Sequence, residues 1–431
     1  MKKISIFTML LFAPLQIANA TEVSFDDAWN TIYKNSHLVK SAEFDKDAAH
    51  MARTRSALNW LPKVYVAGSG FQTNDPAMVF MGNLKQEQVS VTDFNPDILN
   101  SPTKADFYTG SVGVELPLFE GGRKYREYTA NGHYLKSAKF NEKQTKNMLY
   151  AQVLQQYGSL IVLAQEKEQL QEVQRIIDNV SKNYQLNRAQ NPMGKSGAMG
   201  LKSLSNRLDI MLMENAEREK SIRELMAMQG IKDTDWQPTN ISITDLLSEK
   251  VKLDLKSESF GLQSGDEHAQ GMRQSAFAAG AAHLPYVSAF AQNDIFNGDR
   301  GTGHSYTVGL SFKWSLYDPS TMGIEREAKL RAAAQQEKVA VMRENESAAR
   351  NSLLSSLEAS KKSVDLMKES YELLVNQTTQ TNKMFKNGVI NVLQWLEVLS
   401  RRTDVIQNLR DSELNLLQQN VYSITQSKFE I

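Results

Sequence analysis

Residue types that commonly carry catalysis are present in this chain, but their spacing forms no complete catalytic motif. Gly194-Lys195-Ser196 matches the end of a phosphate-binding loop, yet position 189 is alanine where that motif needs glycine, and no strand precedes it. The six histidines are scattered and show no metal-ligand spacing. The chain has no cysteine, which excludes thiol nucleophiles, thiolate metal sites and disulfides. We therefore expect no enzyme activity, no cofactor and no metal.

Composition narrows the functional class further. Lysine plus arginine and aspartate plus glutamate number 49 each, so the net charge is zero and gives no reason to expect a nucleic-acid partner. No glycine-flanked serine resembles a nucleophile elbow. A secreted hydrolase thus stays a hypothesis for which no active-site residues can be named.

The first twenty residues have the pattern of a secretory signal peptide. Lys2-Lys3 precede an apolar run over 4–15, and Ala18-Asn19-Ala20 is an A-x-A cleavage site. We expect the mature chain to begin at Thr21, without the cysteine that a lipid anchor would need. Past the signal, no stretch approaches the roughly 20 apolar residues of a membrane helix.

Twice in the chain, a half-buried strand leads directly into a very long helix. Alternating apolar residues predict a strand over 108–118, and a proline-free helical pattern then continues toward Pro192. The same sequence of elements recurs with a strand over 306–316 and a helical pattern to about Asn387. Duplication of one supersecondary unit is the main organisational feature of the chain.

Each copy extends on both sides of this strand and helix. The first repeat spans 21–230 and contains a helix over 25–60, a β-hairpin over 63–118, the long helix, a break over 187–200 and a returning helix. A connecting segment follows over 231–257. The second repeat spans 258–431, with its β-hairpin over 285–316. The returning helices share a related segment, 204–209 in the first copy and 399–404 in the second. The predicted fold class is mainly α with a small β part, with long antiparallel helical coiled coils and four strands per chain.

Four amphipathic strands are too few to close a barrel, because the smallest barrels have about eight strands. An exported chain whose strands have one apolar face fits an outer-membrane β-barrel shared between copies. The alternative is a soluble β-sandwich edge packed on helices. Six aromatic residues near the strand ends are candidates for the membrane interface: Tyr65, Phe71, Phe107, Tyr108, Tyr306 and Trp314.

Several segments together resemble the TolC family of outer-membrane efflux and secretion channels. They are Leu61-Pro62 and Leu284-Pro285 before the strands, 112–122, the loop text of 79–86 and 93–102, and 385–388 followed by 393–399. The resemblance covers nearly all of 21–428. It implies a homotrimer with a twelve-stranded barrel in the outer membrane and an α-helical tunnel through the periplasm.

The resemblance also implies roles for the helix breaks. They would be periplasmic tips that dock an adaptor protein, and five tip residues are candidates: Gly194, Gly197, Gly388, Val389 and Ile390. Acidic residues past the second tip can ring the tunnel entrance in this family. Glu397 falls at one such position and Gln394 at the other, so this chain departs from a double acidic ring. For Glu397 the alternative is a solvated carboxylate on a helix face.

Three functions follow as hypotheses. The first is a passive exit duct of a tripartite export system. Such a duct would contact outer-membrane lipid and would work with a periplasmic adaptor protein and an inner-membrane transporter. Small-molecule efflux and type I polypeptide secretion are both compatible with it. The second is a periplasmic coiled-coil structural or adaptor protein, which would stay soluble without detergent. The third is the secreted hydrolase.

Overall fold

The computed structural model describes residues 21–187, 192–232, 236–252 and 257–430. The predicted signal peptide over 1–20 lies outside these residues. The chain divides into two compact units, each assembled from segments that are distant in sequence. Unit 1 comprises residues 1–40, 145–259 and 347–431, and unit 2 comprises 41–144 and 260–346.

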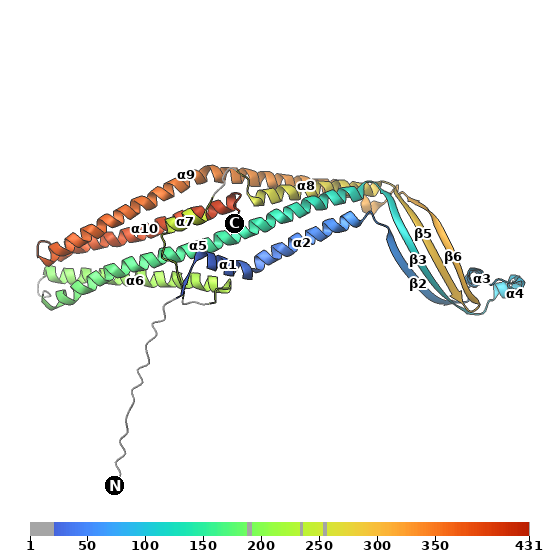
Figure 1. Ribbon diagram of the computed structural model, residues 1–431, viewed down its shortest axis with the longest axis horizontal. Helices are drawn as coiled ribbons and strands as arrows, with labels where there is room; N and C mark the ends of the chain where they lie inside the picture. The colour runs from blue at the N-terminus through green and yellow to red at the C-terminus, as the bar shows by residue number, and fades with distance from the viewer. Residues whose placement is uncertain (1–20, 188–191, 233–235, 253–256, 431) are drawn as a thin grey trace, which may run out of the picture. The chain divides into compact units, whose positions relative to one another are not determined.

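Unit 2 contains a four-stranded antiparallel sheet with strand order β2-β3-β5-β6 (Figure 1). The strands are β2 (Lys63–Thr73), β3 (Ala105–Glu120), β5 (Tyr286–Gly298) and β6 (Gly301–Lys313). The two predicted hairpins are therefore adjacent in one sheet, because β3 also pairs with β5. That pairing shifts register between Pro117 and Phe119, since proline cannot donate to the ladder.

The strand register gives this sheet one apolar face and one mainly polar face. Paired residues lie on the same face, and side chains alternate along each strand. The apolar face carries Val64, Val66, Val112, Val114, Leu116, Ala289, Ala291, Val308, Leu310 and Phe312. The polar face carries Ser69, Thr109, Ser111, Glu115, Gln292, Asp294, Ser305, Thr307 and Ser311. Val66, Val308 and Leu310 are at least 70% exposed, so none of the described residues covers the apolar face there.

The connection between β2 and β3 is folded rather than extended. It contains α3 (Pro76–Lys85), a 3-10 turn η1 (Val91–Phe94) and α4 (Pro96–Asn100), at the end of the strands opposite the long helices of this unit (Figure 1). Asp75 and Asn95 cap the two helices, each followed by a proline at the first helical position. The sequence pattern had indicated only a long loop here.

The remainder of unit 2 is helical. It contains most of α2 (His37–Leu58), α8 (Phe260–Gly280) and the first parts of α5 (Arg123–Asn187) and α9 (Ile324–Lys386), with short 3-10 turns at 281–283 and 319–321. Helix α8 approaches α5 closely where a Cβ on Gly271 would come 2.5 Å from the Tyr134 ring. Further along, the Ser137 hydroxyl donates to the Ser264 carbonyl at 2.9 Å.

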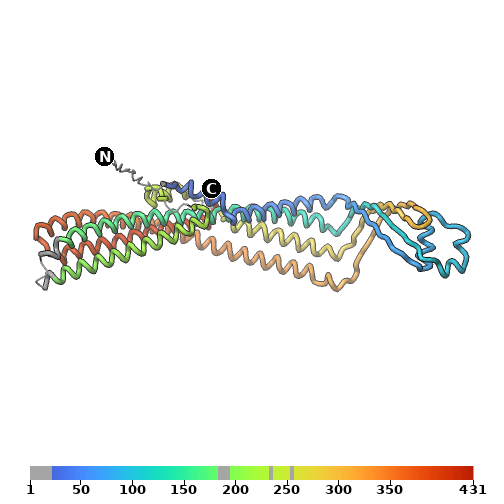
Figure 2. Tube along the Cα trace, turned by 90° about the horizontal axis from the view of Figure 1, so that it is seen from below, coloured from blue at the N-terminus to red at the C-terminus, as the bar shows by residue number. Residues whose placement is uncertain are grey.

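Unit 1 is built on two helical hairpins. The second part of α5 turns back as α6 (Pro192–Met228), and the second part of α9 turns back as α10 (Val392–Gln426). The hairpins lie side by side in both views (Figures 1 and 2). Helices α1 (Phe25–Asn35) and α7 (Ile243–Lys250) pack beside them, with a short parallel pair of β1 (Thr21–Val23) and β4 (Trp236–Pro238).

The larger of two apolar clusters in unit 1 joins α1 and α7 to the long helices. It includes fully buried Ile32, Leu154, Tyr157, Met226 and Leu417. The Tyr157 hydroxyl donates to the Val23 carbonyl at 2.8 Å and accepts the Thr239 N–H at 3.0 Å, so one phenol connects the C-terminal ends of β1 and β4. The buried Asn147 amide donates to the Phe429 carbonyl at 2.8 Å.

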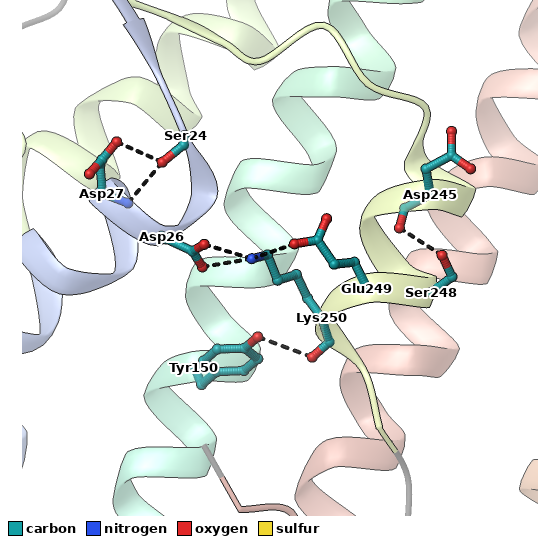
Figure 3. Close-up of polar contacts among 8 residues, drawn as sticks. All are labelled: Ser24, Asp26, Asp27, Tyr150, Asp245, Ser248, Glu249 and Lys250. Carbon is teal, nitrogen blue, oxygen red and sulfur yellow. Dashed lines mark hydrogen bonds and ion pairs between the residues drawn. The ribbon is translucent and has the colours of Figure 1, made fainter.

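Polar contacts hold α7 against the start of α1 (Figure 3). The Lys250 ammonium lies 2.7 Å from Asp26 Oδ2 and 2.9 Å from Glu249 Oε1. The Tyr150 hydroxyl donates to the Lys250 carbonyl at 3.1 Å, and burial raises the pKa of this phenol well above its usual value. Ser24 caps α1 by accepting the Asp27 N–H.

Several expected boundaries differ from the observed ones. The predicted continuous helix over 25–60 breaks at Ser36, which is in an extended conformation and accepts the Val39 N–H at 3.3 Å. Helix α6 already begins at Pro192, whereas the sequence predicted a break through Gly200. Among the described residues, no helix combines the length and apolar character needed to cross a bilayer.

Candidate channel wall and helical tip

The turn between α9 and α10 is a Schellman motif centred on Gly388. The Gly388 N–H donates to the Phe385 carbonyl at 3.0 Å, and the Val389 N–H donates to the Met384 carbonyl at 2.9 Å. Gly388 has a φ of +73°, which favours glycine, and a Cβ there would meet no atom within 4 Å. Val389 is exposed, while Ile390 packs on the core below the turn. Gly388 thus has a conformational role and leaves the surface above it open.

Helix α10 begins with a capping box. The Asn391 side chain accepts the Gln394 N–H at 2.9 Å, and the Gln394 side chain accepts the Asn391 N–H at 3.1 Å. Below this cap, the buried Trp395 ring stacks on Phe385 at 5.2 Å and its indole N–H donates to Asn382. Gln394 therefore has a structural role at the helix start.

Glu397 lies on the solvent side of α10 and is 62% exposed. Its Oε1 accepts from Arg401 Nε at 2.9 Å, one turn further along the same helix. The candidate gate carboxylate therefore has a cation beside it, and neither side chain is buried. The i, i+4 spacing of the two residues is visible in the sequence, but the sequence analysis did not identify them as a pair.

The first tip is only partly within the described residues, because 188–191 lie outside them. Gly194 and Gly197 are helical, inside α6, and Gly197 is buried. One turn later, a Cβ on Gly200 would come 2.8 Å from Leu396 Cδ1, so α6 and α10 are in close contact here. Two of the candidate tip glycines thus belong to a helix rather than to an open loop.

Two ion pairs near the tip link helices of unit 1. Arg402 on α10 is 1% exposed, donates to Glu172 on α5 and donates to the Tyr371 hydroxyl on α9 at 3.2 Å. Arg207 on α6 donates to Asp404 on α10 and to Gln407 at 3.1 Å. Arg207 and Arg402 occupy matched positions of the two related segments, so each repeat uses the same arginine for a contact between helices. Sequence analysis found the matched segments but missed this role.

Comparison with known proteins rests on structure, because no family model and no curated protein matches the sequence. The fold matches the structure of CusC, described with its transmembrane channel formation, with a TM-score of 0.75 over 94% of this chain and 92% of that one, at 12% identity. The Campylobacter jejuni CmeC outer membrane channel matches with a TM-score of 0.75 over 100% and 95%, at 13% identity. The open state of the Neisseria gonorrhoeae MtrE outer membrane channel matches with 0.73 over 94% and 89%, at 12% identity.

The chain has the TolC fold. This confirms the predicted fold class, with its long helices and four antiparallel strands. In this chain the four-stranded sheet has an exposed apolar face, and the α9–α10 hairpin ends in an exposed turn. The two faces of the sheet and the α9–α10 turn are therefore the candidate sites of this chain.

The six candidate interface aromatics separate between the two faces. Tyr108 and Tyr306 lie on the apolar face and are exposed. Tyr65, Phe71 and Phe107 lie on the opposite face, where the Tyr65 hydroxyl donates to Gln292 at 2.8 Å.

Trp314, the sixth of these aromatics, follows the end of β6, and its indole N–H donates to the His283 carbonyl at 3.1 Å. The alternation of Tyr65, Phe71 and Phe107 with their neighbours is visible in the sequence, but the sequence analysis did not use it to assign each aromatic to a face. Tyr108 and Tyr306 thus lie on the apolar face, and their role at a membrane interface, like that of exposed Trp314, stays a prediction.

The described residues contain no group of three or more histidine, aspartate or glutamate side chains that could hold a metal ion. The partial phosphate-loop match also falls inside α6, where a helix replaces the loop that would wrap a phosphate.

Proposed function

We propose that this chain is one protomer of a homotrimeric outer-membrane channel. The observation that carries the proposal is the exposed four-stranded sheet with one apolar and one mainly polar face. Four strands cannot close a barrel, whereas twelve strands from three copies form one wide enough for a polar lumen. The fold shared with the CmeC and MtrE outer membrane channels supports the same assembly.

In this assembly the apolar face contacts outer-membrane lipid and the polar face lines the channel. Exposed Val66, Val308 and Leu310 would lose their contact with water, which is favourable by about 25 cal/mol per Å² of apolar surface. Tyr108 and Tyr306 on that face suit the membrane interface, where an apolar ring and a polar hydroxyl are both satisfied.

The helical tips would dock a periplasmic adaptor protein, which connects the channel to an inner-membrane transporter. Support comes from the α9–α10 turn, where Gly388 and Val389 are exposed and no neighbouring atom lies near the Gly388 Cβ position. The channel itself would be passive, since the proposal assigns it no catalytic residue. It would serve as the exit duct of a tripartite export system, and Glu397 beside its Arg401 partner would lie near the tunnel entrance.

A pair of variants on one strand tests the assembly. Val308→Asp puts a carboxylate on the apolar face, and Thr307→Asp puts the same group on the polar face one residue away. An arginine or lysine facing lipid at the bilayer midplane costs about 2–4 kcal/mol and a carboxylate costs less, so we expect Val308→Asp to reduce membrane insertion. Thr307→Asp should still give detergent-extracted trimers that form channels in planar bilayers.

The contrast between the two variants decides the outcome. If both variants insert equally well, the apolar face does not meet lipid and the barrel is refuted. A wild-type protein that stays soluble without detergent and conducts no current would instead support the periplasmic coiled-coil hypothesis. The trimer is tested separately, by measuring the native mass of the detergent-extracted wild-type protein with light scattering.

A further inference from the structure

The connection between β2 and β3, residues 74–104, forms a compact structure on the polar face of the sheet. We call this segment the lid. Its helix α3 lies over the distal ends of β3, β5 and β6, and four contacts fix it there. None of them follows from the sequence pattern that predicted the strands.

The first contact places α3 directly on an aromatic cluster. A Cβ on Gly82 would come 2.4 Å from Phe107 Cζ, so only glycine allows the helix backbone this close to the ring. Phe107 is 1% exposed, and its ring lies 5.6 Å from Phe71 and 5.4 Å from Phe296. All three rings belong to the otherwise polar face. Apolar residues are stable at these positions because α3, rather than water, covers them.

The second contact pins the end of α3 to the turn between β5 and β6. Gln86 is 1% exposed, and its Oε1 accepts the N–H groups of Arg300 and Gly301, both at 2.9 Å. One buried side chain thus satisfies two backbone donors of the turn. Close approach of the backbones supports the same arrangement, because a Cβ on Gly303 would come 2.0 Å from the Lys85 carbonyl oxygen.

The third contact is a bidentate ion pair between Arg300 and Asp93. Arg300 Nη1 lies 2.8 Å from Asp93 Oδ2, and Arg300 Nη2 lies 2.8 Å from Asp93 Oδ1. Asp93 is buried and also accepts the Ser90 N–H at 2.7 Å, which fixes the 3-10 turn of the lid. Hydrogen bonds from Arg300 and from the Ser90 backbone hold the pKa of this carboxyl well below its usual range. The lowered pKa favours the ionised carboxylate, which is the form that pairs with Arg300.

The fourth contact also involves Arg300. Its Nη1 donates to the Gln88 carbonyl at 3.3 Å, so the guanidinium contacts two separate points of the lid. Planar guanidinium groups suit such multiple contacts. Arg300 lies in the β5–β6 turn and every partner named here lies in the lid, so this side chain connects two segments more than 200 residues apart.

From these contacts we infer that the lid narrows the outer mouth of the channel and limits the size of solutes that leave it. The inference rests on the proposed function, in which the polar face is the channel wall. Each copy places its lid on that wall at the strand ends, so three lids share one mouth. We call the Gln86, Asp93 and Arg300 contacts the clasp, because they hold the lid in this position.

The clasp is tested by limited proteolysis, which needs no channel. Trypsin cleaves after Lys85, whose following residue, Gln86, is buried in the clasp, and after exposed Lys104, which serves as an internal reference. Asp93→Asn removes the charge from the ion pair. We expect cleavage at Lys85 relative to Lys104 to rise about tenfold or more in this variant, since a lost charge-assisted bond raises the open population by that factor. Asp97→Asn, at an exposed aspartate of the same lid, should change nothing.

A second variant displaces the lid without substituting a clasp residue. Gly82→Leu favours the α3 helix locally but cannot fit against Phe107, so the lid must move from its position on the wall. We expect Gly82→Leu and Asp93→Asn to raise both Lys85 cleavage and single-channel conductance in detergent-purified protein placed in planar bilayers. Helical circular dichroism and native mass would verify that each variant is folded.

Each outcome has a distinct meaning. Unchanged Lys85 cleavage in both variants would overturn the clasp. Raised cleavage with unchanged conductance would show that the lid leaves the wall without affecting flow, and would overturn its role at the mouth. If the wild-type protein forms no channel, the proposed function fails, while the proteolysis result still tests the docked lid.

Discussion

The exposed pair of Glu397 and Arg401 allows a prediction whose sign can be checked. With both side chains present, the carboxylate and the guanidinium are 2.9 Å apart and nearly cancel for an ion passing at a distance. Glu397→Gln would leave three uncompensated positive charges in a trimer, and Arg401→Gln would leave three negative ones. The two variants should therefore shift ion selectivity in opposite directions, toward anions and toward cations, if the pair faces the tunnel.

The size of the shift follows from Coulomb's law in water. A unit charge about 8 Å from a passing ion contributes about 0.5 kcal/mol in bulk solvent. Screening over one Debye length at physiological salt reduces this to roughly 0.2 kcal/mol. Three charges then change the free energy of a passing ion by roughly 0.6 kcal/mol. The change has opposite signs for cations and anions, so the ratio of their permeabilities changes about sevenfold. Loss of the exposed pair itself costs little stability, about 0.3–0.5 kcal/mol.

Reversal potentials in a salt gradient across a planar bilayer measure this ratio directly. Lys428→Gln, at a lysine of unit 1 beyond the end of α10, is a suitable control for a change of net charge. Opposite shifts from Glu397→Gln and Arg401→Gln, both reduced at 1 M salt, would place the pair at the tunnel wall. Two variants with wild-type selectivity would refute that placement and leave Glu397 as a solvated side chain.

Three further predictions concern the tip glycine Gly388, the Glu172–Arg402 ion pair and the buried carboxyl group of Glu413. Gly388→Ala should lower stability by about 1 kcal/mol through its positive φ alone, seen as a lower thermal midpoint of the helical signal, and Gly388→Asn should lose less. Glu172→Gln should lower the free energy of unfolding by about 1–2 kcal/mol, measured in urea, because it leaves the buried Arg402 without a carboxylate. Arg402→Met should lower it by less, and equal losses in the two variants would contradict this explanation. Burial raises the pKa of Glu413, so the folded state binds this proton more tightly than the unfolded chain, and stability falls as pH rises through the folded pKa. Glu413→Gln should therefore be more stable than wild type at pH 7 but not at pH 4, and a constant difference at both would exclude this cause.

Sequence periodicity predicted the elements that repeat over long distances. The two alternating segments and the two proline-free helical patterns correspond to β3, β6, α5 and α9, because each sustains one period for many residues. Short breaks were harder to predict. Ser36 ends α1 through one cap, and Pro192 starts α6 despite three glycines in the following turns, since packing against α10 outweighs their low helix propensity.

The candidate site shows the same division. Gly388 adopts the left-handed conformation by which a glycine between two helical patterns commonly ends a helix, while its contact with an adaptor stays a prediction. The roles of Gln394 and Glu397 depend on which local partner each side chain meets, and the structure provides Asn391 and Arg401 as those partners. Phe107 looked like an interface residue because its apolar type suits lipid, but its strand position puts it on the face that α3 covers. Composition alone cannot distinguish these two apolar environments.

The composition of unit 1 has a consequence for how the protein reaches its folded state. Its core closes only when three distant segments meet, and the Asn147 amide bonds to the Phe429 carbonyl across 282 positions. Contacts between residues so far apart in sequence form slowly, because closing the long loop between them costs entropy before the contacts can stabilise it. Residues 25–35 thus cannot complete their packing until the chain has been made beyond α10. A protein built this way completes the core of unit 1 only after nearly its whole chain has been made.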